Sequence, residues 1–359
     1  MSDQAEKLRA LVSAAESVVE CAESAPATVV VSGGSAGVGA TTVALNLAAV
    51  LVDRGERVLV VEAAEQRRDM RAVAGVRREI SYGLLDVLEG KCEVGEAITA
   101  GPAGVAMVVS RGRLEASRRT EFQRDPPQAG GFLQNSQHGR RIGVQRWEQR
   151  TGSGCESSPR RSFDRRDSPT GASRSDLGAS RQAFQVFISS LQSLADAFDV
   201  VVVDAGAGMS AWVQRLWSRA GLVALVTTPE DAAVLDAYAT FKQGIAAEPA
   251  INVRLLVNQA QSERVASETQ RRMDHSCQRF LTRALPALPA LPRHLAGEFV
   301  ESPAPPRVWE MPNTPFGHAA LWLGKAVGEV LRVEDAGCGM QGVDRTIASA
   351  SSIPHPTSC

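Results

Sequence analysis

Apolar positions along the chain fall into two patterns that follow each other in a regular order. Short unbroken runs rich in β-branched residues predict strands buried on both faces, at about 28–31, 57–61, 105–110, 199–204, 222–227 and 253–258. Longer stretches with a helical period predict helices at about 42–52, 81–88, 182–197, 231–244, 262–282 and 318–332. Alternation of this kind implies right-handed crossovers. We therefore expect an α/β domain with a doubly wound, mostly parallel sheet.

Three segments fall outside that alternation. Residues 1–25 contain a short amphipathic helix at about 3–20, followed by Pro26. Between Arg111 and Arg181 there are 15 arginines, no lysine and 8 acidic residues, and apolar residues are too sparse to form a core, so we expect disorder over 114–182. The tail at 334–359 has the same character. The domain is thus expected to consist of residues 26–113 and 183–333.

Composition narrows the class of protein. The 359 residues are 44% hydrophobic with a net charge of -1, which is typical of a globular chain and argues against a dedicated nucleic-acid binder. For the Arg-rich segment three interpretations stay open: an arm for nucleic acid or anionic lipid, a solvated insertion without a partner, or a local shift of reading frame. Six scattered cysteines, a polar N-terminus and no apolar run of about 20 residues favour a cytoplasmic protein.

A glycine-rich loop follows the first predicted strand and precedes a helix. Its sequence, SGGSAGVGATT, follows the P-loop pattern G-x-x-x-x-G-K-[ST] at Gly34, Gly39 and Thr41, whereas Ala40 occupies the lysine position. Glycines let main-chain N–H groups point at a phosphate, and a hydroxyl at Thr41 suits Mg²⁺. Loss of the lysine should weaken triphosphate binding by about 10- to 150-fold. A glycine-rich turn without a ligand remains the alternative.

Five segments in the same order resemble the MinD/ParA-type P-loop ATPases of the SIMIBI class, and in particular the FlhG (FleN, YlxH) branch. These are DQAEKLR at the start, SGGSAGVGATTVALNLA, FDVVVVDAGAGMS, VTTPEDAAVLDAYATFK and LLVNQAQS. The usual phosphate loop of the family, SGKGGVGKTTVALNLA, carries two lysines, which fall on Ser35 and Ala40 here. The resemblance covers about residues 3–110 and 183–332.

Carried over position by position, this resemblance implies an ATP and Mg²⁺ site. Thr41 and Asp204 would serve Mg²⁺, the latter through water. Asn258 would read the adenine and Pro292 would line its pocket. Without the family order, a polar cap at a strand end would be the favoured interpretation of Asn258. The phosphates would lie against the loop and the start of the helix, at Gly34, Gly37, Val38, Gly39, Ala40, Thr41 and Thr42.

The part of the family pattern that activates water is incomplete. The family has V-D-x-D after its second strand, and this chain has Val61-Glu62-Ala63-Ala64. Ala64 cannot orient water or accept its proton, which leaves Glu62 as the one weak catalytic candidate, with Glu65 an unsupported substitute. Since both loop lysines and this Asp are missing, we expect weak ATP binding and little or no hydrolysis.

The resemblance also implies a function and partners. FlhG-type proteins regulate flagellar number and placement, dimerise with ATP, associate with the membrane, and stimulate the FlhF GTPase through the N-terminal helix, here with Asp3, Gln4, Leu8 and Arg9. A helix packed on its own domain is the alternative for that segment. The C-terminal helix, in which Lys325 and Arg332 are the only cations, favours core packing over a membrane surface.

A degenerate FlhG-like regulator is the first hypothesis. The others are a working slow ATPase with ATP-dependent dimerisation and peripheral membrane association, and a ParA-like protein bound to nucleic acid, which the net charge disfavours.

Overall fold

The computed structural model of the protein describes residues 25–65, 70–110, 181–293 and 307–337. The predicted N-terminal helix with Asp3, Gln4, Leu8 and Arg9, nearly all of the Arg-rich segment, and the tail beyond residue 337 lie outside the described residues. The expectations about these segments therefore remain predictions.

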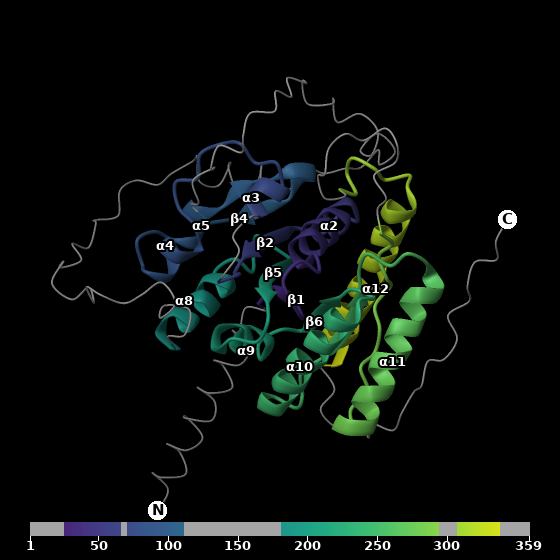
Figure 1. Cartoon of the computed structure of the whole chain (residues 1–359). Helices are drawn as coiled ribbons and strands as arrows, with labels where there is room; N and C mark the ends of the chain where they lie inside the picture. Colours follow the sequence, from purple (N-terminus) through teal and green to yellow (C-terminus); the bar gives the residue numbers. More distant parts are fainter. Residues whose placement is uncertain (1–24, 66–69, 111–180, 294–306, 338–359) are drawn as a thin grey trace, which may run out of the picture.

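The described residues form one seven-stranded sheet in the order β3-β4-β2-β5-β1-β6-β7 (Figure 1). Every pair of neighbours is parallel except β3 and β4. The central strands β1, β2 and β5 are almost wholly buried, as their β-branched runs predicted. The strands are β1 (Ala27–Gly33), β2 (Val58–Glu62), β3 (Thr99–Ala100), β4 (Ala106–Val108), β5 (Val200–Ala207), β6 (Leu222–Thr227) and β7 (Val253–Val257). The predicted doubly wound, mostly parallel sheet is confirmed.

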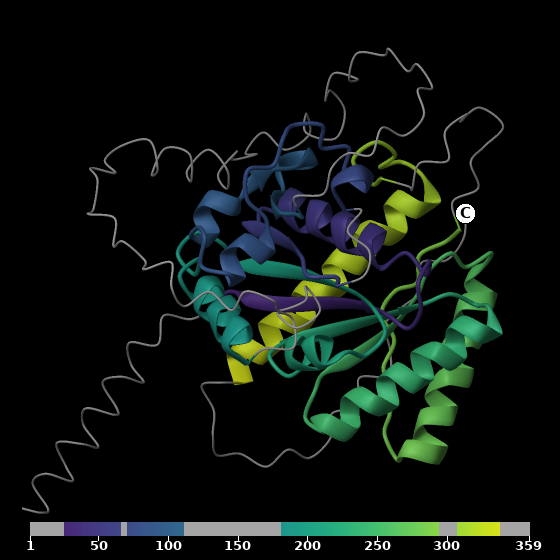
Figure 2. The same ribbon diagram turned by 60° about the vertical axis from the view of Figure 1, so that its left-hand side comes forward.

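Helices cover both faces of this sheet (Figures 1 and 2). On one face α2 (Ala40–Asp53), α3 (Met70–Val73) and α12 (Pro315–Gly337) contribute to a shared core. On the other lie α4 (Leu84–Leu88), α5 (Val94–Ala97), α8 (Arg181–Gln192), α9 (Ala211–Trp217), α10 (Asp231–Ala247) and α11 (Glu263–Leu281). A short 3-10 turn, η1 (Pro102–Gly104), precedes β4. This layering places the carboxyl ends of β1, β2 and β5 at one edge of the sheet.

The C-terminal helix belongs to the core. Helices α2 and α12 lie side by side in both views, and the stripe of α12 that faces inward is buried at Ala320, Leu323, Val327 and Leu331, while Trp322 is 43% exposed. The helix continues to Gly337, beyond the boundary expected at residue 333. None of the helices in the described part of the chain is both long and apolar enough to cross a bilayer.

Five short elements, α3, α5, β3, η1 and α9, were not predicted from the sequence. Strand β3 has two residues and α9 has seven, so neither is long enough for a periodic pattern to stand out. The start of α9 is nevertheless well defined, because the Ser210 side chain accepts a hydrogen bond from the Val213 amide at 3.2 Å. The helix expected from residue 81 begins instead at Leu84, after Gly83 in an extended conformation.

Candidate phosphate-binding site

The loop between β1 and α2 has the backbone shape that its glycines predict. Both Gly37 and Gly39 have φ of 89°, in the left-handed region that favours glycine. A Cβ on Gly39 would lie 2.5 Å from Nδ2 of Asn258, whereas a Cβ on Gly37 would meet nothing within 4 Å. Gly39 therefore fulfils two requirements, one of conformation and one of space, while Gly37 fulfils only the first.

Neighbouring elements fix this loop from three sides. The Gly34 amide donates to the Val226 carbonyl at the end of β6, at 3.0 Å. A Cβ on Gly34 would lie only 2.5–2.8 Å from backbone and side-chain atoms of Ala237, so the loop and α10 meet backbone to backbone. The Gly208 amide, after β5, donates to the Gly33 carbonyl at 3.0 Å. The loop is thus a rigid part of the sheet edge.

Thr41 and Asp204 meet at this edge, as the sequence predicted for a Mg²⁺ pair. The Thr41 hydroxyl donates to Oδ2 of Asp204 at 2.6 Å, although the residues are 163 positions apart. Asp204 is 1% exposed, and its Oδ1 accepts the Gly206 amide at 3.0 Å. A hydroxyl and a carboxylate are oxygen donors of the kind that Mg²⁺ prefers.

The protein supplies only part of a Mg²⁺ shell at this point. Among the residues that the structure describes, no group of three or more His, Cys, Asp or Glu could hold a metal. Mg²⁺ normally keeps several waters and takes one or two protein ligands together with substrate phosphates. The pair therefore fits a Mg²⁺ ion that arrives with a nucleotide, and Thr41 and Asp204 are the residues that would hold it.

Two amide side chains from the end of β7 fasten the loop. Asn258 is buried, and its Nδ2 donates to the Val38 carbonyl at 2.8 Å. Gln259, which the sequence analysis missed, has φ of 57° and donates from Nε2 to the Gly37 carbonyl at 3.4 Å. Its position directly after Asn258 is the only signal that could have identified it. Asn258 thus positions the loop, and its reading of adenine stays a prediction.

The remaining predicted loop residues lie at the same site. Val38 and Ala40 are buried, at 3% and 8% exposed, and Thr41 and Thr42 are partly exposed at the start of α2. Pro292 forms a parallel bridge with Ala260, which brings it beside the chain that leaves β7 after Asn258. The structure therefore brings together the residues predicted for phosphate, metal and base.

Glu62 has a different environment from that of a general base. It is 3% exposed at the end of β2. Its Oε1 accepts the Met70 amide at 2.9 Å, and its Oε2 accepts the Ser110 amide at 2.7 Å. Both carboxylate oxygens therefore hold backbone, one at the start of α3 and one beyond the end of β4.

Apolar groups fill the position of the missing Asp. Ala64 is 4% exposed, and its Cβ lies 2.9 Å from where a Cβ on Gly206 would be. The preceding carbonyl, of Ala63, accepts the indole N–H of Trp212 at 3.0 Å, and Trp212 packs edge-on against Phe184 and Phe187. Trp212 follows no motif, so the sequence analysis did not identify it. This arrangement can bind an anion with Mg²⁺, but Ala64 offers no group to orient water.

Comparisons with known proteins agree with the geometry. A family model described as an AAA domain matches residues 27–124. The antiactivator FleN of Pseudomonas aeruginosa is 26% identical over 264 residues, which cover 74% of this chain and 72% of that protein. The septum site-determining protein MinD of Bacillus subtilis is 37% identical over 70 residues, and this alignment spans 26% of its length.

Solved structures share the fold. The cell division ATPase MinD of Pyrococcus furiosus has a TM-score of 0.53 at 20% identity, covering 85% of this chain and 99% of that one. MinD of Pyrococcus horikoshii, solved in complex with Mg-ADP, has a TM-score of 0.53 at 19% identity, covering 88% and 99%. At these identities the likeness concerns the fold alone.

Proposed function

Because the chain belongs to the MinD/ParA-type family of P-loop proteins, in its FlhG branch, we propose that it regulates flagellar number or placement through a degenerate ATP site. In this proposal ATP with Mg²⁺ binds weakly and is hydrolysed slowly or not at all. The protein then acts as a regulatory scaffold, and its effect depends on which partner it contacts.

One observation carries the proposal. The hydroxyl of Thr41 and the carboxylate of Asp204 lie 2.6 Å apart at the mouth of a loop that has lost its lysines. Main-chain amides and a helix N-terminus still attract phosphate, so some binding should persist. Hydrolysis requires a positioned water as well as charge neutralisation. With Ala64 in place of the Asp and both oxygens of Glu62 bonded to backbone, that requirement is not met.

Binding and turnover of ATP test this proposal directly. We expect a fluorescent ATP analogue to bind about 10- to 150-fold more weakly than to a relative with both lysines, and phosphate release to stay at background. Asp204→Ala should abolish the Mg²⁺-dependent part of binding, whereas Asp196→Ala, at an exposed position on the same segment, should not. Phosphate release at the rate of an intact relative, lost in Asp204→Ala, would overturn the scaffold proposal.

The proposed partner is a FlhF-type GTPase that contacts the N-terminal segment through Asp3, Gln4, Leu8 and Arg9. The support for this partner is the DQAEKLR sequence together with the FleN relative. Gln4→Ala should abolish stimulation of GTP hydrolysis by a FlhF-type protein. Glu6→Ala, at a variable position of the same element, is the matched control and should leave stimulation intact. Equal stimulation by wild type and Gln4→Ala would refute the partner.

A second candidate is a working slow ATPase that dimerises with ATP and associates peripherally with the membrane. The contact between Thr41 and Asp204 is compatible with it, because the resemblance to the MinD/ParA-type family assigns both residues to Mg²⁺. Size-exclusion chromatography with ATP and Mg²⁺ separates the two candidates. A dimer that appears with ATP, disappears with ADP and fails to form in Asp204→Ala would favour the slow ATPase.

A further inference from the structure

A hollow of about 350 Å³ lies between two loops at the β3–β4 edge of the sheet. One wall is the turn after α3, and the other is the chain from the end of β3 into η1. We call it the arginine hollow and define it by its lining residues, Ala74, Gly75, Val76, Arg77, Arg78, Ala100, Gly101 and Pro102.

Positive charge is concentrated on one wall of the arginine hollow. Among the described residues that line it, Arg77 and Arg78 are the only ones with charged side chains, and none carries a carboxylate. Nη2 of Arg78 donates to the Ala100 carbonyl of the opposite wall at 3.0 Å. Neither arginine forms an ion pair with any residue that the structure describes. Hydrogen bonds to carbonyls leave the charge of a guanidinium in place, so the hollow is electropositive.

Two further arginines lie behind this wall and support it. Arg71 holds the turn by donating from Nε to the Val76 carbonyl at 3.2 Å. Nη1 of Arg307 lies 3.5 Å from where a Cβ on Gly75 would be, and it pairs with Glu310 at 2.9 Å. The Nε of Arg307 is buried and has no hydrogen-bond partner among the described residues. The turn that forms this wall is therefore held in place by hydrogen bonds from Arg71 and lies beside the Arg307–Glu310 ion pair.

The arginine hollow is separate from the phosphate loop. The η1 wall packs beside the end of α2, since a Cβ on Gly104 would lie 3.7 Å from the Val52 side chain. The phosphate loop joins the other end of α2, at Ala40. With a rise of 1.5 Å per residue, these two positions are about 18 Å apart along the helix. A ligand in the hollow would therefore not share the nucleotide site.

We propose that the arginine hollow binds a phosphate group, carried either by a soluble metabolite or by a lipid headgroup. Guanidinium groups match phosphate because their N–H donors form a planar fork that can bind two oxygens. Arg77 contributes a guanidinium that forms no ion pair with a described residue, and Arg78 contributes the donors that do not reach Ala100. Gly75, with φ of 70°, lets the turn after α3 take its shape, and Gly101 lets the opposite wall pack against Met107, whose Sδ would collide with a Cβ on Gly101.

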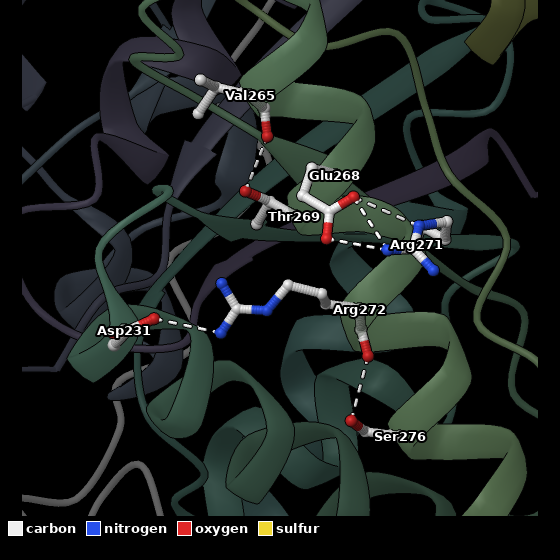
Figure 3. Close-up of polar contacts among 7 residues, drawn as sticks. All are labelled: Asp231, Val265, Glu268, Thr269, Arg271, Arg272 and Ser276. Atoms are coloured by element: carbon white, nitrogen blue, oxygen red, sulfur yellow. Dashed lines mark hydrogen bonds and ion pairs between the residues drawn. The ribbon is translucent and has the colours of Figure 1, made fainter.

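Hydrogen–deuterium exchange with inorganic pyrophosphate as the probe locates the binding. In the full chain, we expect pyrophosphate to slow exchange in peptides covering residues 70–80 and 99–105. This protection should be lost in the double variant Arg77→Ala with Arg78→Ala. The matched control is Arg271→Ala with Arg272→Ala, a second adjacent pair of exposed arginines. In Figure 3 these two contact Glu268 and Asp231, and neither lines the arginine hollow. Arg77→Ala alone, which removes no contact with a described residue, should weaken protection about tenfold.

Vesicles of phosphatidylglycerol and of phosphatidylcholine distinguish the two sources of phosphate. The ligand would be a lipid headgroup if the protein cosediments with phosphatidylglycerol vesicles and not with phosphatidylcholine vesicles. This cosedimentation should be lost in the double variant of Arg77 and Arg78 and kept in the control variant of Arg271 and Arg272. Protection by pyrophosphate without cosedimentation would assign a soluble ligand. Protection confined to residues 33–42, or lost equally in both arginine pairs, would overturn the proposal, because the effect would then belong to the phosphate loop or to net charge.

Discussion

The loops after β1 and β2 leave the same edge of the sheet on either side of β5, yet only one of them retains its family chemistry. In register, Asp204 of β5 stands opposite Val31 on one side and Glu62 on the other. The loop after β1 keeps its glycine conformations, its anchors and its contact with Asp204. The chain after β2 has the buried methyl of Ala64 at the position where the family pattern that it resembles has a water-orienting carboxylate.

The difference lies in what each function needs. Anion binding by the first loop depends on main-chain N–H groups, and these survive any substitution that preserves the path of the backbone. Orientation of water depends on one carboxylate at one position, and no backbone group can replace it. Binding is therefore the property that should outlast catalysis in this site, and each of the following changes tests one side of that comparison.

The largest expected effect concerns Glu62 in the chain after β2. Glu62→Ala would leave the buried amides of Met70 and Ser110 without their charged acceptor. Since a hydrogen bond to a charged group contributes about 1.5–3 kcal/mol, the free energy of unfolding should fall by about 3–5 kcal/mol in urea denaturation. Glu65→Ala, three positions on, is the control and should change it little. A stable Glu62→Ala protein with altered ATP turnover would mean that Glu62 acts in catalysis after all.

The next largest expected effect comes from substituting two glycines of the loop after β1. Gly39→Val adds backbone strain and a collision with Asn258, and should abolish binding of an ATP analogue while costing about 2–4 kcal/mol of stability. Gly37→Val has the same φ but open space around it, so the strain alone should cost about 1–2 kcal/mol. Equal effects of the two variants on stability would show that the contact with Asn258 does not constrain the loop.

Introducing lysines into the loop after β1 should strengthen nucleotide binding there. Ser35→Lys with Ala40→Lys should tighten binding of the ATP analogue by about 10- to 150-fold, because charge-assisted hydrogen bonds to phosphate return. Ala36→Lys adds a cation at an exposed position of the same loop and should have little effect. Phosphate release should remain slow in both variants, since Ala64 is unchanged. Unaltered affinity in the double variant would mean that the loop is not a phosphate site.

The smallest expected effect is at the opposite end of the strands. Burial would raise the pKa of Asp199, but hydrogen bonds from the side chain and backbone of Arg57 outweigh it and hold that pKa below its ordinary value. A lowered carboxylate pKa stabilises the fold above the ordinary value of about 4, and this contribution is lost as the pH falls through the lowered pKa.

Asp199→Asn should therefore shift the urea midpoint at pH 7, and the shift should shrink as the pH falls below about 4. Because the side chain of Asp199 is 37% exposed, the shift should correspond to less than about 1 kcal/mol. Asp231→Asn removes a more exposed, single contact with Arg272 and serves as the control, with a smaller shift expected. Nucleotide binding should not change in either variant, and a change in Asp199→Asn would show that the two ends of β5 are coupled.

Much of the fold was predictable because unbroken apolar runs mark buried strands. Strand β6 coincides with its predicted range, between Gly221 and Thr228, since all of its residues are buried. The contact between Thr41 and Asp204 could be expected only from the order of family motifs and from the rule that parallel strands end at one edge. Spacing alone could not predict it.

The sequence could not predict which side chains form hydrogen bonds with main-chain groups. That both oxygens of Glu62 are bonded to amides depends on the paths of α3 and β4, and an amide has no signature in the sequence. The same holds for Gln259, whose contact is with the Gly37 carbonyl, and for the indole of Trp212, which donates to the Ala63 carbonyl. Tertiary structure, rather than residue type, decides such contacts.

Asn46, in the middle of α2, joins the beginning of the domain to its end. Its Nδ2 donates to the Thr42 carbonyl at 2.7 Å, and its Oδ1 accepts the Val308 amide at 2.6 Å, in a position 2% exposed. The first crossover helix is thus completed only when residues 262 positions later have been synthesised. A nascent or truncated chain that stops short of Val308 would expose the α2 face meant for α12, so the phosphate loop should mature last rather than first.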